Sequence, residues 1–213
     1  MVDRRTKADP ASLGDLIELT EQEVADKEAE NGLLQFDRMF QEIEEAIKRG
    51  IAPLTPEIVK EFQLLAVDGL ERTAGEFRTG PVSIDGSVHI PPPAAEVAQR
   101  VNEMCQYVND HWGEAEALHL AAYVMWRLNW IHPFVNGNGR TSRVASYLVL
   151  CAALGMSLPG DRTFAEIIDE DKRAYYQALD AADAHWLDGT LDVSEMTLVI
   201  EGALTIQLQN AEG

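Results

Sequence analysis

The sequence has few basic residues and no long apolar run. Lysine and arginine number 17 against 36 aspartate and glutamate residues, a formal net charge of −19. Phosphate backbones are bound by clustered basic side chains, so this deficit argues against nucleic acid as a partner. No stretch approaches the roughly 18 to 20 apolar residues that cross a bilayer, and Met1–Pro10 lacks the apolar core of a signal peptide. We therefore expect a cytoplasmic protein that binds neither nucleic acid nor membrane.

Cysteine is nearly absent as well, with only Cys105 and Cys151 in the chain. Each lies within an apolar helical pattern, and there is no Cys-x-x-Cys motif that would indicate a zinc site. A bridge is not expected in a reducing compartment. We expect two buried free thiols.

The chain is rich in hydrophobic residues, which make up 46% of its 213 residues. This is enough to bury a sizeable core. The apolar residues recur mostly at helical spacing, and no alternation of strands and helices is present. We therefore predict an all-α helical bundle. Residues 1–53 form a helical extension to a domain over 54–213, in one compact unit, and Ala115–Trp130, apolar on nearly every face, forms its central buried helix.

One segment departs from the helical pattern. Val82–Ile84 and Val88–Ile90 alternate apolar and polar residues on either side of Asp85-Gly86, a turn dipeptide that favours hairpins. We predict a small two-stranded flap over residues 82–90.

The most unusual loop, His132-Pro-Phe-Val-Asn-Gly-Asn-Gly-Arg-Thr-Ser-Arg143, lies between two predicted helices. Gly137 and Gly139 permit backbone conformations in which successive N–H groups turn toward one anion, and the following helix adds the positive end of its dipole. Arg140 and Arg143 lie in the first turn of that helix and can hold phosphate oxygens. His132, whose ordinary pKa is near neutral, can accept a hydroxyl proton. The loop predicts a polyphosphate site beside a general base.

This loop resembles the signature H-x-F-x-(D/E)-G-N-G-R-x-x-R of the Fic family at seven of its eight specified positions. The resemblance implies a Fic-type helical bundle that transfers AMP from ATP to a hydroxyl side chain of a target protein. It makes His132 the general base. It also implies that an extended target segment pairs with the 82–90 flap. The remaining residues that it assigns to nucleotide and phosphate binding are Gly137, Asn138, Gly139, Arg140 and Arg143.

The sequence differs from the Fic signature at one specified position, the fifth. The family places Asp or Glu there to hold Mg²⁺, whereas this chain has Asn136, whose neutral amide oxygen is a weaker ligand for a hard cation. The resemblance therefore implies ATP as substrate, and it leaves both the Mg²⁺ requirement and the identity of the transferred group open.

Three further features are implied by the resemblance alone. Tyr175 and Tyr176 lie in a segment similar to the one that lines the adenine pocket of Fic proteins, although their spacing fits core or groove residues better than adenine contacts. Fic proteins are often inhibited by a helix of pattern (S/T)-x-x-x-E-(G/N). Thr197–Gly202 matches it with Glu201, and Asp26–Asn31 matches it with Glu30 except for its first residue. Three alternatives therefore stay open: Glu201 is the inhibitory residue, Glu30 is, or the chain has no inhibitory helix.

Two other functions remain open at this stage. Because of Asn136 the chain can instead be a relative that transfers another phosphate-containing group, such as phosphate or phosphocholine. It can also be a catalytically silent module that binds a partner protein through its flap. The sequence leaves the oligomeric state open, with a homo-oligomer among the alternatives.

Overall fold

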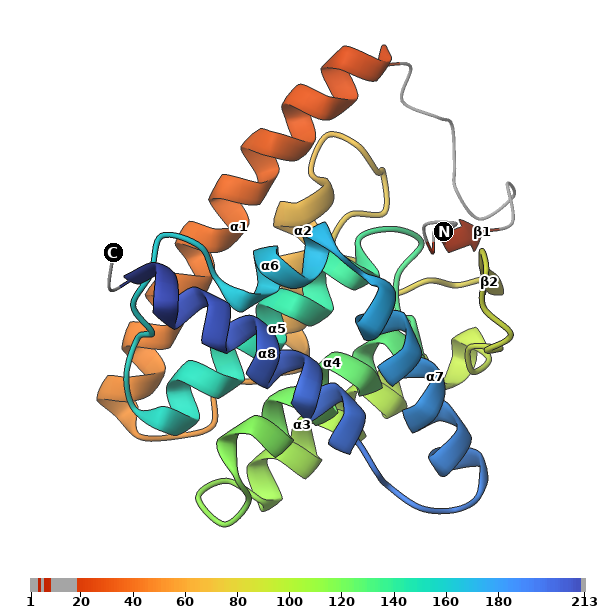
Figure 1. Cartoon of the computed structure of the whole chain (residues 1–213). Helices are drawn as coiled ribbons and strands as arrows, with labels where there is room; N and C mark the ends of the chain where they lie inside the picture. Colours follow the sequence, from red (N-terminus) through yellow and green to blue (C-terminus); the bar gives the residue numbers. More distant parts are fainter. Residues whose placement is uncertain (1–3, 5, 9–18, 212–213) are drawn as a thin grey trace.

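Eight α-helices and two short strands make up the part of the chain that the computed structural model describes, residues 4, 6–8 and 19–211. The mostly helical fold predicted from the sequence is confirmed (Figure 1). None of the helices in these ranges is long and apolar enough to cross a membrane. In chain order the elements are β1 (Thr6–Ala8), α1 (Glu21–Arg49), α2 (Pro56–Val67), β2 (Val82–Ile84), the 3₁₀ turn η2 (Ala94–Glu96), α3 (Val97–Asp110), α4 (Ala117–Ile131), α5 (Asn138–Leu154), α6 (Phe164–Glu170), α7 (Arg173–Leu187) and α8 (Ser194–Ala211).

The core is organised around α4 and α5, which pack against each other at the centre of the bundle (Figure 1). Ten of the fifteen residues of α4 are buried, as expected for a helix that is apolar on nearly every face. The Ser146 hydroxyl donates a hydrogen bond of 2.8 Å to the Ala121 carbonyl, which joins the two helices. Both cysteines are buried and free, as predicted, and burial raises the pKa of the Cys105 thiol to about 12. The prediction of a central buried helix is confirmed.

Local sequence signals set where the helices begin and end. The Thr55 side chain accepts from the Ile58 backbone N–H, and Pro56 occupies the first helical position of α2. The apolar residues that recur at helical spacing from Leu33 to Ile47 predict only the second half of α1. The helix begins at Glu21 because Thr20 and Glu23 form a capping box over its polar first half. This early start carries α1 past the opening of the site described below.

The two strands belong to segments far apart in the sequence. β1 pairs antiparallel with β2, with Thr6 opposite Ile84 and Ala8 opposite Val82. The prediction of a hairpin within 82–90 is therefore wrong in its second half, although Gly86 does turn the chain at a φ of 68°. His89 explains the difference. Its ring bonds the Trp130 carbonyl at 2.8 Å and lies 3.4 Å from Asp183, which ties this segment to the helices instead of to β2.

Candidate active site

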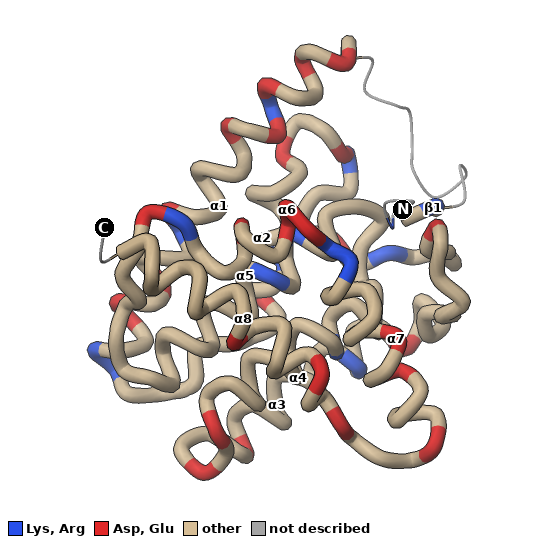
Figure 2. Tube along the Cα trace, viewed as in Figure 1, with Lys and Arg blue, Asp and Glu red and all other residues tan. Residues whose placement is uncertain are grey.

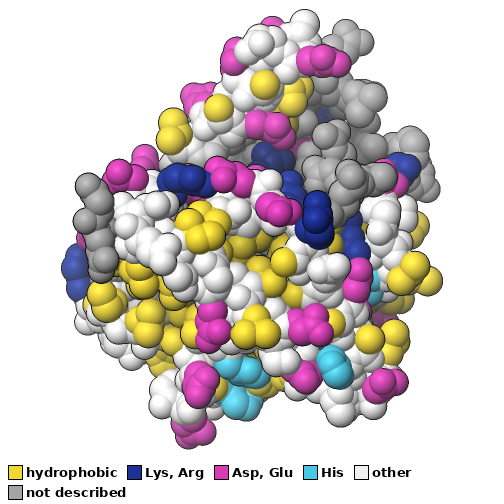
Figure 3. All heavy atoms as spheres, viewed as in Figure 1, with side chains coloured by type: hydrophobic (Ala, Val, Ile, Leu, Met, Phe, Trp, Pro, Cys, Tyr) yellow, Lys and Arg dark blue, Asp and Glu magenta, His cyan; other side chains and the backbone are white. Residues whose placement is uncertain are grey.

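A cavity of about 930 Å³ lies between α1, the start of α5 and the junction of α6 with α7. It brings together the predicted base His132, the glycine loop and both predicted arginines, with the N-terminal segment around Thr6 along one side. Basic residues lie at the start of α5 and at the α6–α7 junction (Figure 2), and Lys and Arg side chains gather in the hollow beneath α1 (Figure 3). Carboxylates line the cavity as well, and Arg140, Arg143 and Lys172 each lie within ion-pair distance of one of them, so an anion bound here would compete with these acidic partners.

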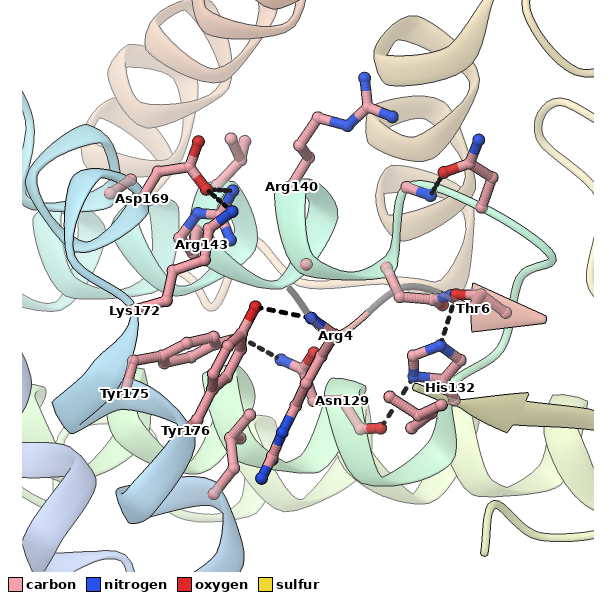
Figure 4. Close-up of a pocket in the computed structure, with 18 of the residues that line it drawn as sticks. Arg4, Thr6, Asn129, His132, Arg140, Arg143, Asp169, Lys172, Tyr175 and Tyr176 are labelled. Carbon is pink, nitrogen blue, oxygen red and sulfur yellow. Dashed lines mark hydrogen bonds and ion pairs between the residues drawn. The ribbon is translucent and has the colours of Figure 1, made fainter. Parts of the chain in front are cut away.

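His132 is the C-cap of α4 and adopts a left-handed backbone conformation with φ of 50°, uncommon for a residue with a side chain. Its ring lies at the floor of the cavity (Figure 4). Nδ1 is 3.2 Å from the Asn129 carbonyl, which can only accept, so Nδ1 carries the hydrogen. Nε2 is then an acceptor, and the Thr6 hydroxyl donates to it at 2.7 Å. The neutral ring therefore presents its basic nitrogen to a hydroxyl group.

The surroundings keep His132 uncharged. Its side chain is almost completely buried, and burial is the main reason that its pKa falls from 6.5 to about 3. The positive charge of Arg78 lowers the pKa further, while the hydrogen bond to Asn129 raises it. At neutral pH this histidine accepts protons in hydrogen bonds and does not act as a cation.

This burial predicts a specific acid sensitivity. Between pH 6.5 and pH 3 the unfolded chain binds a proton at His132 that the folded chain does not, so stability falls as the pH decreases through that window. At about 1.4 kcal/mol per pH unit, this residue should account for a loss of about 2 kcal/mol between pH 7 and pH 5. Chemical denaturation of the wild type and of His132→Gln across this range measures it. Equal slopes for the two proteins would contradict the assignment.

The loop after His132 is shaped by Gly137 and Asn138. Gly137 has φ of 80°, and a Cβ there would lie 2.9 Å from Val67 Cγ1, so no larger residue fits. The Asn138 side chain donates to the Phe134 carbonyl and accepts from the Phe134 N–H. The loop closes on itself, and the first N–H groups of α5, at Asn138, Gly139 and Arg140, have no partners within the helix. The sequence predicts that such N–H groups bind an anion, and this role stays a prediction.

Arg140 and Arg143 line the same cavity but contact different elements. Arg140 donates to the Ala66 carbonyl at 2.8 Å and lies 3.4 Å from the Glu28 carboxylate of α1. Arg143 forms a 2.6 Å ion pair with Asp169 of α6, which Lys172 also contacts at 3.1 Å (Figure 4). Arg143 and Lys172 thus meet at Asp169, and of these two cations Lys172 is the one that the sequence did not suggest.

Residues 53–150, which contain the flap, the loop and most of α5, match the sequence profile of the Fic/DOC family. The chain contains a Fic/DOC family domain. Over 88 residues it is 36% identical to the protein adenylyltransferase Fic of Drosophila persimilis and 38% identical to that of Drosophila melanogaster. These matches span 41% of this chain but only 16% and 17% of the two relatives.

Solved structures of similar fold cover almost the whole chain. A Fic domain containing signaling protein from Bacteroides thetaiotaomicron aligns with a TM-score of 0.67 at 20% identity, over 94% of this chain and 78% of that one. Fic-1 from C. elegans aligns with a TM-score of 0.66 at 18% identity, over 94% and 54% of the two chains. At this level of identity the likeness concerns the fold alone. The expectation of a Fic-type bundle is confirmed.

At the fifth signature position of the Fic/DOC domain, both ends of the Asn136 amide are engaged. Its oxygen accepts from the Gly137 N–H at 2.7 Å, and its nitrogen donates to the Glu71 carboxylate at 2.9 Å. Glu71 also lines the cavity. Glu71, which the sequence did not suggest, therefore brings a carboxylate to the position where the signature has one.

The remaining predicted residues of the Fic/DOC domain are divided between the cavity and the surface. Tyr175 and Tyr176 line the cavity, and the Tyr175 hydroxyl accepts from Asn129 Nδ2 at 2.8 Å. Neither candidate inhibitory glutamate lines it. Glu30 is exposed and pairs with Lys27 at 2.8 Å, and Glu201 is exposed on α8. Two other acidic residues reach the signature arginines in this structure: Glu28, two positions from Glu30, lies 3.4 Å from Arg140, and Asp169 pairs with Arg143.

Sequence patterns missed the residue that holds the His132 loop of the Fic/DOC domain in place. Arg78 is 4% exposed, and its guanidinium donates to four backbone carbonyls. Those carbonyls belong to Gly80, Pro92, Ile131 and His132. Arg78 thereby ties the flap to the C-terminal end of α4, where its positive charge also complements the helix dipole. Every residue has a backbone carbonyl, so a sequence pattern cannot show which carbonyls accept a hydrogen bond from Arg78. Only the structure identifies this role.

Proposed function

We propose that this chain is a protein adenylyltransferase that transfers AMP from ATP to a hydroxyl side chain of a target protein. The observation that carries the proposal is the 2.7 Å contact between a hydroxyl group and the basic Nε2 of neutral His132, in the cavity that contains the start of α5. A base, an acceptor hydroxyl and an anion site are the three groups that transfer from a nucleotide requires.

Each group has a defined part in the reaction. The N–H groups at the start of α5 bind phosphate oxygens, and Arg140, Arg143 and Lys172 balance the remaining charge of the triphosphate. The acceptor oxygen attacks the α-phosphorus, the bond to the β-phosphate oxygen breaks, and pyrophosphate leaves with its electron pair. The hydroxyl proton passes to His132 Nε2. Negative charge from the triphosphate raises the pKa of His132 from its value of about 3, which makes the ring a stronger base when nucleotide is bound.

A divalent cation fits this site only together with the nucleotide. Within the described ranges no three His, Cys, Asp or Glu side chains are grouped to hold a metal by themselves. The Glu71 carboxylate is a hard oxygen donor of the kind that Mg²⁺ prefers, and phosphate oxygens would complete the shell. The Asn136 oxygen already accepts from the Gly137 N–H, so it would join that shell only by giving up this hydrogen bond. When bound, Mg²⁺ would neutralise charge on the phosphates.

Asn136→Asp tests this account of the metal. The change replaces an amide that donates to Glu71 by a second carboxylate, and two adjacent carboxylates repel each other unless a cation lies between them. We expect a lower Mg²⁺ concentration for half-maximal transfer and a higher rate. Transfer is titrated against Mg²⁺ for both forms, with Asp161→Asn, outside the cavity, as a control. An unchanged metal requirement would exclude this position as part of the metal site.

The acceptor is expected to approach as an extended segment. The edge of β2 pairs with a strand in this structure, so it has the geometry for strand addition by a target protein. We further propose that the reaction takes place in the cytoplasm, where ATP is available and both thiols stay reduced.

Asn136 favours one alternative, the transfer of a different phosphate-containing group, because it weakens the metal position. Two parallel incubations with a cell extract, one with ATP labelled at the α-phosphate and one with ATP labelled at the γ-phosphate, distinguish adenylyl transfer from phosphoryl transfer. Label from the α-phosphate of ATP on a protein band supports adenylyl transfer, and label from the γ-phosphate supports phosphoryl transfer. If neither label is transferred and the protein does not bind ATP, the result supports the remaining alternative, a catalytically silent module that binds a partner protein.

A further inference from the structure

We infer that Thr6 is an acceptor hydroxyl for the enzyme's own active site, modified by the His132 of the same chain. The inference rests on the proposed function and adds a substrate to it. Thr6 and His132 are 126 residues apart in the sequence, yet the Thr6 hydroxyl donates to Nε2 at 2.7 Å (Figure 4). Asn138 Nδ2 lies 3.4 Å from the same oxygen. These two contacts orient a hydroxyl at the base.

The backbone places Thr6 there by strand pairing. β1 lies antiparallel to β2, with Thr6 opposite Ile84 and Lys7 opposite Ser83. Side chains alternate along an extended segment, so Lys7 points the other way, and its ammonium forms a 2.7 Å ion pair with Asp85. Only one side of the strand faces the cavity, and it carries the hydroxyl.

A second anchor fixes the register. Arg4 lies two residues before Thr6 in the sequence, and its guanidinium forms a 2.6 Å ion pair with Asp180. The same guanidinium lies over the Tyr176 ring at 4.7 Å, and the Arg4 backbone N–H donates to the Tyr176 hydroxyl at 3.2 Å. A shift of one residue along β2 would remove these contacts together with the one to His132. The anchors therefore specify Thr6 as the residue presented.

The chemical step needs ATP as its only co-reactant. The Thr6 oxygen forms a bond to the α-phosphorus, pyrophosphate leaves, and the hydroxyl proton goes to His132 Nε2. The product is an adenylyl ester of Thr6. Because donor site and acceptor belong to one chain, the reaction is intramolecular and has a high effective concentration of acceptor.

The test uses the full chain with Mg²⁺ and ATP labelled at the α-phosphate. Label is located by intact mass and by mapping of the N-terminal peptide. We expect one adenylyl group on Thr6 of the wild type, retained in Thr6→Ser, lost from that peptide in Thr6→Val, and reduced on the order of 10²-fold or more in His132→Ala. The matched control is Lys7→Gln, on the opposite side of the strand, which should keep the label.

Two further measurements separate the outcomes. The first-order rate should stay constant over about a hundredfold dilution of the protein. In a mixture of Thr6→Val and His132→Ala chains, Thr6 should remain unlabelled, and label on it would contradict the intramolecular reaction. AMP and pyrophosphate are assayed in parallel. Formation of AMP that depends on His132, with Thr6 unlabelled, would overturn this inference and leave the proposed function standing. Absence of label, AMP and ATP binding would overturn both.

Discussion

Replacing His132 by alanine should abolish transfer and leave the fold intact. The ring supplies the only basic nitrogen that contacts a hydroxyl within the part of the cavity that is described, through Nε2 at 2.7 Å. Removal of a positioned general base costs on the order of 10²- to 10⁴-fold in rate. The rate is measured with α-labelled ATP, and the fold is measured by circular dichroism and thermal unfolding.

The matched control for this experiment is His185→Ala. His185 lies near the end of α7, outside the cavity, where its side chain is half exposed and 3.8 Å from Asp192. Its replacement should leave the transfer rate unchanged. Retained transfer in His132→Ala, with unchanged stability, would refute the role of this residue as the base.

The second large effect should come from Arg78. Arg78→Leu leaves four backbone carbonyl groups without their charged donor, three of them in buried hydrogen bonds and among these that of His132. Each hydrogen bond from a charged group is worth about 1.5 to 3 kcal/mol, and part of the loss is recovered because the buried cation is removed too. We expect the free energy of unfolding to fall by about 3 kcal/mol or more, and transfer to fall because the His132 loop is no longer held.

Arg78→Lys should give an intermediate result, since an ammonium keeps the charge but cannot reach acceptors as widely spaced as a guanidinium can. Arg162→Leu is the control. Its exposed guanidinium pairs with Glu170 at the surface, so its loss should change stability by no more than about 0.5 kcal/mol. Denaturant titration gives these values. A loss below about 1 kcal/mol for Arg78→Leu would contradict the role of Arg78 in holding the loop.

Much of this arrangement could be predicted from the sequence, because its signals are local. Gly137 and the residues around it fix the loop through backbone conformation, and Thr55 fixes the start of α2 through a cap. The burial of α4 follows from its apolar composition. In each of these cases the cause and the structure lie within a few residues of one another.

The rest depends on contacts between distant segments. The alternation in Val82–Ile84 predicts a strand but does not identify its partner, and that partner is Thr6–Ala8. Glu28 reaches Arg140 because α1 begins early and passes over the cavity, a matter of helix packing. Arg78 is bound by backbone carbonyls, which every residue possesses. No sequence pattern predicts any of these three contacts between distant segments.

The most direct test of the account is the identity of the leaving group. The wild-type protein is incubated with ATP, Mg²⁺ and acceptor, and the phosphorus-containing products are followed by ³¹P NMR beside those of His132→Ala. If the hydroxyl activated by His132 attacks the α-phosphorus, pyrophosphate should form in step with modified protein and should be absent from the variant. Formation of ADP in step with modified protein would mean that the γ-phosphorus is attacked, which would contradict adenylyl transfer.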